Sequence, residues 1–166
     1  TRKQEVVEQR LAEWERLYAR EKLTLSEKEL SGVLYERGVD SHGFARIRSR
    51  GDQALFGGST TQEMKFKLRV PSTRALADFL PAVTIKAKDL ATEITNHNIK
   101  QDGTLRGEPI IAGEHVKNNR NMREMLVKSG IYPEALPAEE DIQKLGRRLK
   151  SEGKKLSKQV KVLKKK

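Results

Sequence analysis

The chain has no cysteine, few aromatic residues and no long apolar run, and each absence excludes a class of protein. Without cysteine there is no disulfide, thiolate metal ligand or cysteine nucleophile, a composition typical of a cytoplasmic protein. No apolar run approaches the about 18 residues that a membrane-spanning helix needs, so we expect no membrane span and no membrane partner. Aromatic residues make up 5% and hydrophobic residues 36% of the 166 residues, which predicts a modest core in one domain.

The sequence also lacks the residue patterns of catalytic and metal sites. His42, His97 and His115 are too far apart for typical metal-ligand spacing, and no common hydrolase, zinc-protease or dinucleotide-binding motif is present. Gly57 and Gly58 are not followed by lysine in the pattern of a phosphate-binding loop. They predict instead a structural turn that uses backbone conformations closed to other residues. We therefore expect a protein that is not an enzyme and that binds no metal or cofactor.

Positive charge is concentrated at the C-terminal end of the chain. The formal net charge is +11, and residues 147–166 hold ten basic residues and one acid, which leaves the rest close to neutral. Such a segment is typical of proteins that contact nucleic acid or an acidic protein surface, and a solvated, frayed terminus is the alternative. The candidate binding residues here are Arg147, Arg148, Lys150, Lys154, Lys155 and Lys158.

A second basic segment, 64–77, contains no acid. Pro71 is expected to break it into two helices joined by a turn. Helix-turn-helix pairs that bind the major groove usually have a small residue and a glycine at the positions of Lys65 and Arg69, where the two helices touch. We therefore expect a helix-turn-helix in local shape only, without base recognition. The candidate binding residues of this segment are Lys65, Lys67, Arg69 and Arg74.

The spacing of apolar residues predicts an all-α, multi-helical fold with no strand. The opening helix, 2–22, has one apolar stripe whose members are expected to pack against other parts of the protein. Because the first residue already lies within this helical pattern, we expect a fragment that lacks an N-terminal part. The stripe consists of Val7, Leu11, Trp14 and Tyr18.

Capping residues and glycines divide the middle of the chain into further helices. Thr24 with Glu27 predicts the start of a second helix, which is expected to stop at Gly38. Asp40 or Ser41 is expected to cap a third helix that ends at Gly51. The remaining expected helices are a short one capped at Thr60, one capped at Ser72, and two over about residues 83–98 and 113–128.

The last helix is expected to begin near Ala138, with acids in its first turn and cations toward its end, as the helix dipole favours. Its heptad stripe has no matching second row after the first heptad, so it suits docking better than a self-sufficient coiled coil. These boundaries divide the chain into a connecting helix from a missing N-terminal domain (1–23), a helical domain (24–137) and a basic C-terminal helix and tail (138–166). The stripe residues are Ile142, Leu149, Leu156 and Leu163.

A family resemblance is carried by four runs and covers the chain from residue 1 to about residue 155. They are the opening run TRKQEVVEQRLAEWERLYAREKLTLSEKELSGVLYERGVDSHGFARIRSRGDQALFGG (1–58), GDQALFGGSTTQEMKFKLRVPSTRALADFLPAVTIKAKDLATEITNHN (51–98), GEHVKNNRNMRE and LPAEEDIQKL. The chain resembles the C-terminal region of the bacterial DNA-damage-inducible protein D (DinD) family, without its N-terminal BRO-type domain. The resemblance implies a role in the SOS response, in which the best-described member opposes RecA filaments on single-stranded DNA. It supplies no catalytic residues, and Arg69 departs from the glycine that the family favours.

Three functions remain open from the sequence. The first is a non-enzymatic modulator that binds the RecA filament, its single-stranded DNA, or both. The second is a transcriptional regulator of the phage-antirepressor kind, in which this region binds DNA or a repressor. The third is a basic helical scaffold that holds partners together or forms a homo-oligomer.

Overall fold

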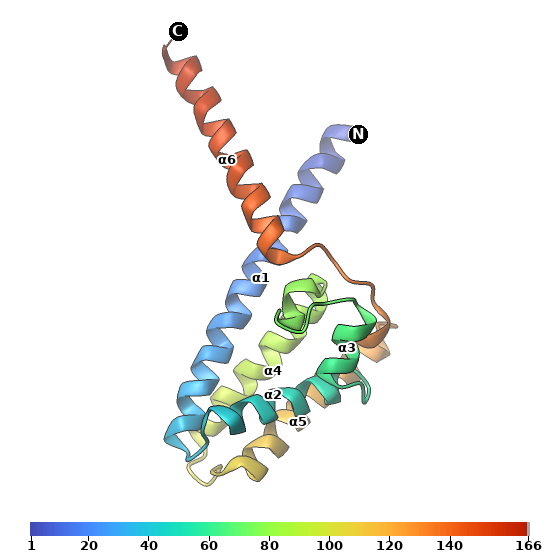
Figure 1. Ribbon diagram of the computed structural model, residues 1–166, viewed down its shortest axis with the longest axis vertical. Coiled ribbons are helices and arrows are strands. Elements are labelled where there is room, and N and C mark those ends of the chain that lie inside the picture. The colour runs from blue at the N-terminus through green and yellow to red at the C-terminus, as the bar shows by residue number, and fades with distance from the viewer. Residues whose placement is uncertain (166) are drawn as a thin grey trace.

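The computed structural model describes residues 1–165, in which all regular secondary structure is helical and no strand occurs (Figure 1). The all-α fold predicted from the apolar spacing is confirmed. Lys166, the last residue of the predicted basic tail, lies outside the described residues. In chain order the elements are α1 (Arg2–Glu36), α2 (Ser41–Leu55), α3 (Thr61–Lys67), the 3-10 helix η1 (Leu76–Phe79), α4 (Ala82–Gln101), α5 (Glu108–Lys128), the 3-10 helix η2 (Pro133–Ala135) and α6 (Ile142–Lys165).

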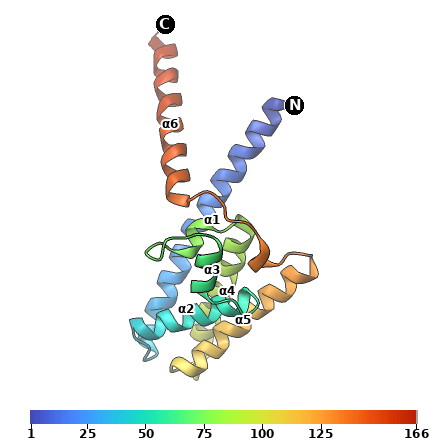
Figure 2. The same ribbon diagram turned by 45° about the vertical axis from the view of Figure 1, so that its right-hand side comes forward.

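Two pairs of helices build the body. α1 packs along α4, and α2 packs along α5, which in turn contacts α4. Figures 1 and 2 show the N-terminal part of α1 and most of α6 projecting from the same end of this body and diverging from each other. The core between the pairs is formed by two clusters of buried side chains, of which the largest members are Leu23, Phe56, Met64, Leu80 and Ile85 in one and Leu30, Leu34, Ile47, Ile99 and Ile111 in the other.

α1 is one continuous helix, so the predicted start of a new helix at Thr24 is wrong. The hydroxyl of Thr24 accepts a hydrogen bond from Arg20 at 2.8 Å and donates one to the Arg20 carbonyl at 3.2 Å. The carboxylate of Glu27 pairs with Arg48 on α2 instead of capping a helix. Both side chains are satisfied elsewhere, and the apolar positions on both sides of Thr24 bury against the same body. A helix that keeps its packing surface has no reason to stop there.

Two predicted caps are confirmed and two predicted helix boundaries are wrong. The side chains of Asp40 and Thr60 accept hydrogen bonds from the backbone of residues 43 and 63. Gly51 does not end α2, which continues to Leu55. Ser72 does not begin an α-helix, because the chain forms a turn after it and then only the 3-10 helix η1 before Pro81.

α6 begins at Ile142, four residues after the predicted start near Ala138. The preceding segment is extended, and the backbone N–H of Glu139 donates to the Phe79 carbonyl at 2.9 Å. The carboxylate of Asp141 then accepts from the N–H of Gln143 at 3.0 Å, as a helix cap does. The first turns of α6 dock on Leu17 of α1 through Ile142, Leu145 and Leu149.

The apolar stripe at the start of α1 does not pack within this chain. Trp14 is 52% exposed and Tyr18 is 58% exposed, and Val7 and Leu11 are exposed as well. The prediction that these are packing residues is therefore wrong for the chain taken alone. The opposite face of α1 makes the contacts to the body, with Ala19, Leu23 and Leu30 buried.

A polar layer lies inside the body, between α2, α4 and α5. The Nδ1 atom of His115 lies 2.9 Å from the hydroxyl of Thr95, and Asn118 donates to the same hydroxyl at 2.9 Å. Lys88 and Asp52 form a buried ion pair next to this ring. Burial, followed by the nearby charge of Lys88, lowers the pKa of His115 from its ordinary value of 6.5 to about 4. The imidazole is therefore neutral inside the folded protein at physiological pH.

We predict that Gly51→Ala lowers the free energy of unfolding by about 1–3 kcal/mol, through overpacking. A Cβ atom at Gly51 would lie 2.6 Å from Cδ2 of His115 and 2.9 Å from Nδ2 of Asn119. The matched control is Gly32→Ala on α1, where nothing lies within 4 Å of the new atom. Gly32→Ala should gain about 0.5–1 kcal/mol from helix propensity. Urea unfolding measures the free energy of unfolding of both variants. Equal changes in the two variants would contradict the close approach of α2 to α5 at Gly51.

The buried histidine predicts a pH dependence of stability. Because the pKa of His115 is about 4 in the folded chain and 6.5 in its ordinary state, the unfolded chain binds more protons between these values. The contribution is fully present above pH 6.5 and is lost as the pH falls toward 4, by about 3 kcal/mol in all. His115→Gln should flatten the dependence of the free energy of unfolding over this range. An unchanged slope in urea titrations at several pH values would contradict the prediction.

Candidate nucleic-acid interface

The basic residues of the segment 64–77 surround the end of α3. The Lys65 ammonium donates to the Ser72 carbonyl at 3.2 Å, and the Lys67 ammonium donates to the carbonyl of Glu134. Arg69 is exposed and has a φ of 58°, in the left-handed region that favours glycine. Its backbone conformation ends the helix, because the next N–H, that of Val70, returns to the Lys65 carbonyl at 2.8 Å.

An exposed aromatic ring lies among these cations. Phe66 is 89% exposed, more than any other large apolar side chain of the described residues. Aromatic rings beside cations are the elements with which proteins stack the bases of single-stranded nucleic acid. We use the name α3 patch for Lys65, Phe66, Lys67 and Arg69. The sequence pattern singled out the cations but not Phe66, whose exposure depends on which face of α3 turns to the core.

The helix-turn-helix geometry is absent from this region. After Pro71 the chain forms a loop and then η1, a 3-10 helix of four residues. Leu76, Ala77 and Asp78 in η1 are buried, so this element presents no face to a DNA groove. Recognition of the major groove needs an exposed second helix. The expectation of helix-turn-helix-like local shape is therefore wrong.

Arg74 is separated from the α3 patch by its ion pairs. Its guanidinium donates to the carboxylate of Asp141 at 2.6 and 2.8 Å and to Asp78 at 3.0 Å, and it lies over the ring of Phe79. Hydrogen bonds from both carboxylates, with that of Asp141 the larger cause, raise the pKa of Arg74. Its charge is thus neutralised within the chain, where it joins η1 to the segment before α6.

The basic residues of α6 divide into two groups at Leu149, the last buried residue of the helix. Arg148 is held by the body, since its guanidinium lies 2.9 Å from Glu13 and 2.8 Å from Glu140. Beyond it, α6 projects into solvent (Figure 2), and we call residues 150–165 the C-terminal arm. Of the predicted binding residues in α6, those that are exposed and form no ion pair with any described residue are Arg147, Lys150, Lys154, Lys155 and Lys158.

The C-terminal arm has two distinct faces. At 3.6 residues per turn, Leu156, Val160 and Leu163 continue the line of Leu149 on one side of the helix. All three are exposed, from 43% for Val160 to 70% for Leu163. The lysines occupy the other sides of the helix, so the arm presents a cationic surface and an apolar stripe at the same time.

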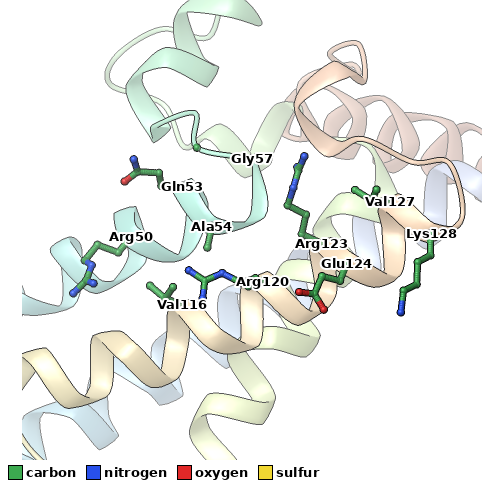
Figure 3. Close-up of a pocket in the computed structure, with 11 residues that line it drawn as sticks. Arg50, Gln53, Ala54, Gly57, Val116, Arg120, Arg123, Glu124, Val127 and Lys128 are labelled. Atoms are coloured by element: carbon green, nitrogen blue, oxygen red, sulfur yellow. The ribbon is translucent and has the colours of Figure 1, made fainter.

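A third cationic region lies in a groove between α2 and α5 that sequence reasoning missed (Figure 3). The groove has a volume of about 750 Å³, and Arg50, Arg120 and Lys128 line it without an ion pair to any described residue. Figure 3 shows Arg50 and Lys128 toward opposite ends of the groove. Residues 50 and 120–128 are far apart in the sequence, so only the pairing of α2 with α5 brings their charges together.

The two glycines that follow α2 shape one end of this groove. Gly57 has a φ of 66° and Gly58 a φ of 101°. A Cβ atom at Gly57 would lie 2.7 Å from the guanidinium of Arg123, which donates to Glu134 at 2.5 and 2.9 Å and to the Leu55 carbonyl at 3.1 Å. Because Gly57 has no side chain, the guanidinium of Arg123 can lie against its backbone. The Arg123–Glu134 ion pair thereby holds the connection between α5 and η2 next to the end of α2.

We predict that Arg74→Ala lowers the urea midpoint of unfolding, because it leaves the buried carboxylate of Asp78 with one partner fewer and frees Asp141. Arg69→Ala is the matched control, since Arg69 forms no ion pair with any described residue and its removal should leave the midpoint nearly unchanged. An Arg74→Ala variant with the same urea midpoint as Arg69→Ala would show that the ion pairs of Arg74 do not stabilise the fold.

The comparisons with known proteins agree with this architecture. No curated protein sequence matches the chain. Within residues 1–165, no helix is both long enough and apolar enough to span a bilayer. A family model described as the DinD C-terminal domain matches residues 11–145, which covers most of α1, all elements from α2 to η2, and the first four residues of α6. The chain therefore belongs to the DNA-damage-inducible DinD family, as its C-terminal domain.

Proposed function

We propose that this domain is a non-enzymatic modulator of RecA filaments on single-stranded DNA, acting in the response to DNA damage. Membership of the DinD family supports the link to DNA damage. The resemblance to that family, described from the sequence, supports the choice of RecA as partner.

The observation that carries the proposal is the C-terminal arm. Its lysines project from the body on a helix and have no acidic partner among the described residues. Each lysine that meets a phosphate releases a counterion from the DNA, so such a surface binds a polyanion with strong dependence on salt. Arg74 and Arg148, which are already paired, have a structural role in this proposal.

The α3 patch supplies a second contact of a different kind. Phe66 offers a ring on which an unstacked base can lie, and Lys67 and Arg69 flank it. Bases are accessible for stacking in single strands and not in an intact duplex. This favours single-stranded DNA over double-stranded DNA as the nucleic acid in contact with the domain.

We predict that neutralising Lys154, Lys155 and Lys158 together to glutamine weakens binding to oligo(dT). The slope of log affinity against log salt should become shallower by about two, because three phosphate contacts are lost. The control is the triple glutamine variant of Lys22, Lys28 and Lys117, which removes the same charge from exposed positions on the body. Fluorescence anisotropy of labelled oligo(dT) at several salt concentrations measures both.

The same two variants test the action on RecA. Added to RecA filaments preformed on labelled single-stranded DNA, the wild-type chain and the body variant should cause filament loss, and the arm variant should not. Filament loss with all three proteins would show that the lysines of the arm are not needed for the action on RecA filaments. No loss with the wild-type chain, alongside a tight complex with a transcriptional repressor, would favour the antirepressor-type alternative.

A further inference from the structure

The outer face of α1 carries an apolar seam with coiled-coil spacing. Val7, Leu11, Trp14, Tyr18 and Leu25 follow one another at alternating steps of four and three residues, apart from one position occupied by Glu21. All five side chains are more than half exposed. This is the spacing of the two core positions of a heptad, with Leu11, Tyr18 and Leu25 at one and Val7 and Trp14 at the other. An apolar surface of this length on a polar helix marks an interaction site.

The seam is independent of the packing of α1 on the body. The buried residues of α1 are on the opposite side of the helix, where Ala19, Leu23 and Leu30 face the core. α6 docks at Leu17, which lies along one edge of the seam, seven residues after Arg10. The core positions of the seam remain more than half exposed beside α6, so they are open to a partner helix.

The charges beside the seam identify its partner. Lys3 and Arg10 lie along one edge of the seam, and Glu8 and Glu15 lie along the other. In a parallel pair of identical helices, Lys3 of each helix lies beside Glu8 of its partner, and Arg10 beside Glu15. In an antiparallel pair the two basic edges meet each other, and so do the two acidic edges. The sequence is thus self-complementary in the parallel orientation and self-repelling in the antiparallel one.

These charged side chains are available at the surface. Lys3, Glu8 and Glu15 are exposed, and Arg10 is partly exposed. Arg10 already contacts Glu13 at 3.4 Å and Glu152 at 3.0 Å, and Glu15 pairs with Lys86. Such exposed pairs contribute little stability, so they exchange partners at small cost.

We propose that the domain forms a homodimer in which α1 of a second copy packs in parallel along the outer face of α1, between residues 3 and 25. The two bodies lie on opposite outer sides of the helix pair. Because the helices run in the same direction, both C-terminal arms project from the same end of the dimer. Two cationic arms then face one strand of nucleic acid together, which increases the effective concentration of the second arm once the first has bound.

The absence of cysteine allows a direct test of the dimer and its orientation. Val7→Cys and Leu25→Cys are made in the full chain, with Val6→Cys as the control, a 49% exposed α1 residue that lies outside both core positions of the seam. Under mild oxidation the two seam variants should each form a disulfide-linked homodimer, and Val6→Cys should not. Residues 7 and 25 are about 27 Å apart along a helix, so a mixture of the two seam variants should give no mixed dimer.

The single tryptophan of the chain provides a second readout. Trp14 lies in the seam, so its emission should shift to shorter wavelength as the protein concentration rises and the dimer forms. Leu11→Ser combined with Tyr18→Ser should abolish the shift and give a monomer by light scattering, whereas Val6→Ser should behave as wild type. Far-ultraviolet circular dichroism checks that the seam variant keeps its helices.

Charge exchange tests the assigned pairs. Glu8→Lys places like charges beside each other in the dimer and should weaken it, and adding Lys3→Glu should restore it. A chain that stays monomeric at all concentrations, or a mixed disulfide between residues 7 and 25, would overturn the proposal. Because none of these experiments involves DNA or RecA, they stand or fall separately from the function proposed above.

Discussion

Asp78 connects the parts of this protein that the sequence places far apart. Its carboxylate accepts from Arg20 of α1 at 2.8 Å and from Arg74 at 3.0 Å, and its carbonyl accepts from Arg16 of α1 at 3.0 Å. Arg74 continues the chain of contacts to Asp141, immediately before α6. The contacts that hold α1, η1 and the segment before α6 together therefore depend on one buried carboxylate, that of Asp78. Removing one member of such a group leaves the others buried with unpaired charge, which is strongly destabilising.

The fold was predictable where local signals and packing agree. Asp40 and Thr60 cap helices as their sequence patterns indicate, because nothing in the tertiary structure competes for their side chains. Thr24 carries an equally good pattern, yet α1 continues through it because the same face of the helix remains buried on both sides. Gly51 resembles a helix stop and instead allows α2 to lie close against His115 and Asn119 of α5. These differences depend on contacts between distant segments, which a local pattern does not contain.

The candidate interface was predictable in charge but not in arrangement. The exposed lysines of the C-terminal arm follow directly from the composition of residues 147–166. Arg74 and Arg148 carry the same charge in the sequence, but acids from distant segments neutralise them. The groove between α2 and α5 shows the converse case, since its cations become neighbours only after folding. The sequence thus shows which segments are rich in basic residues. The positions of the acidic residues in the folded chain determine which of those cations remain unpaired.

The cations of the C-terminal arm also act on the arm itself. Lys150 and Lys154, Lys154 and Lys158, and Lys161 and Lys165 are each one helical turn apart, and like charges at this spacing destabilise a helix. Gly153 weakens the same stretch, and beyond Leu149 no side chain of α6 is buried, so packing offsets neither effect. A polyanion that screens this repulsion stabilises the helical form by mass action. Ligand binding and the coil-to-helix equilibrium of the arm are therefore thermodynamically linked, with each favouring the other.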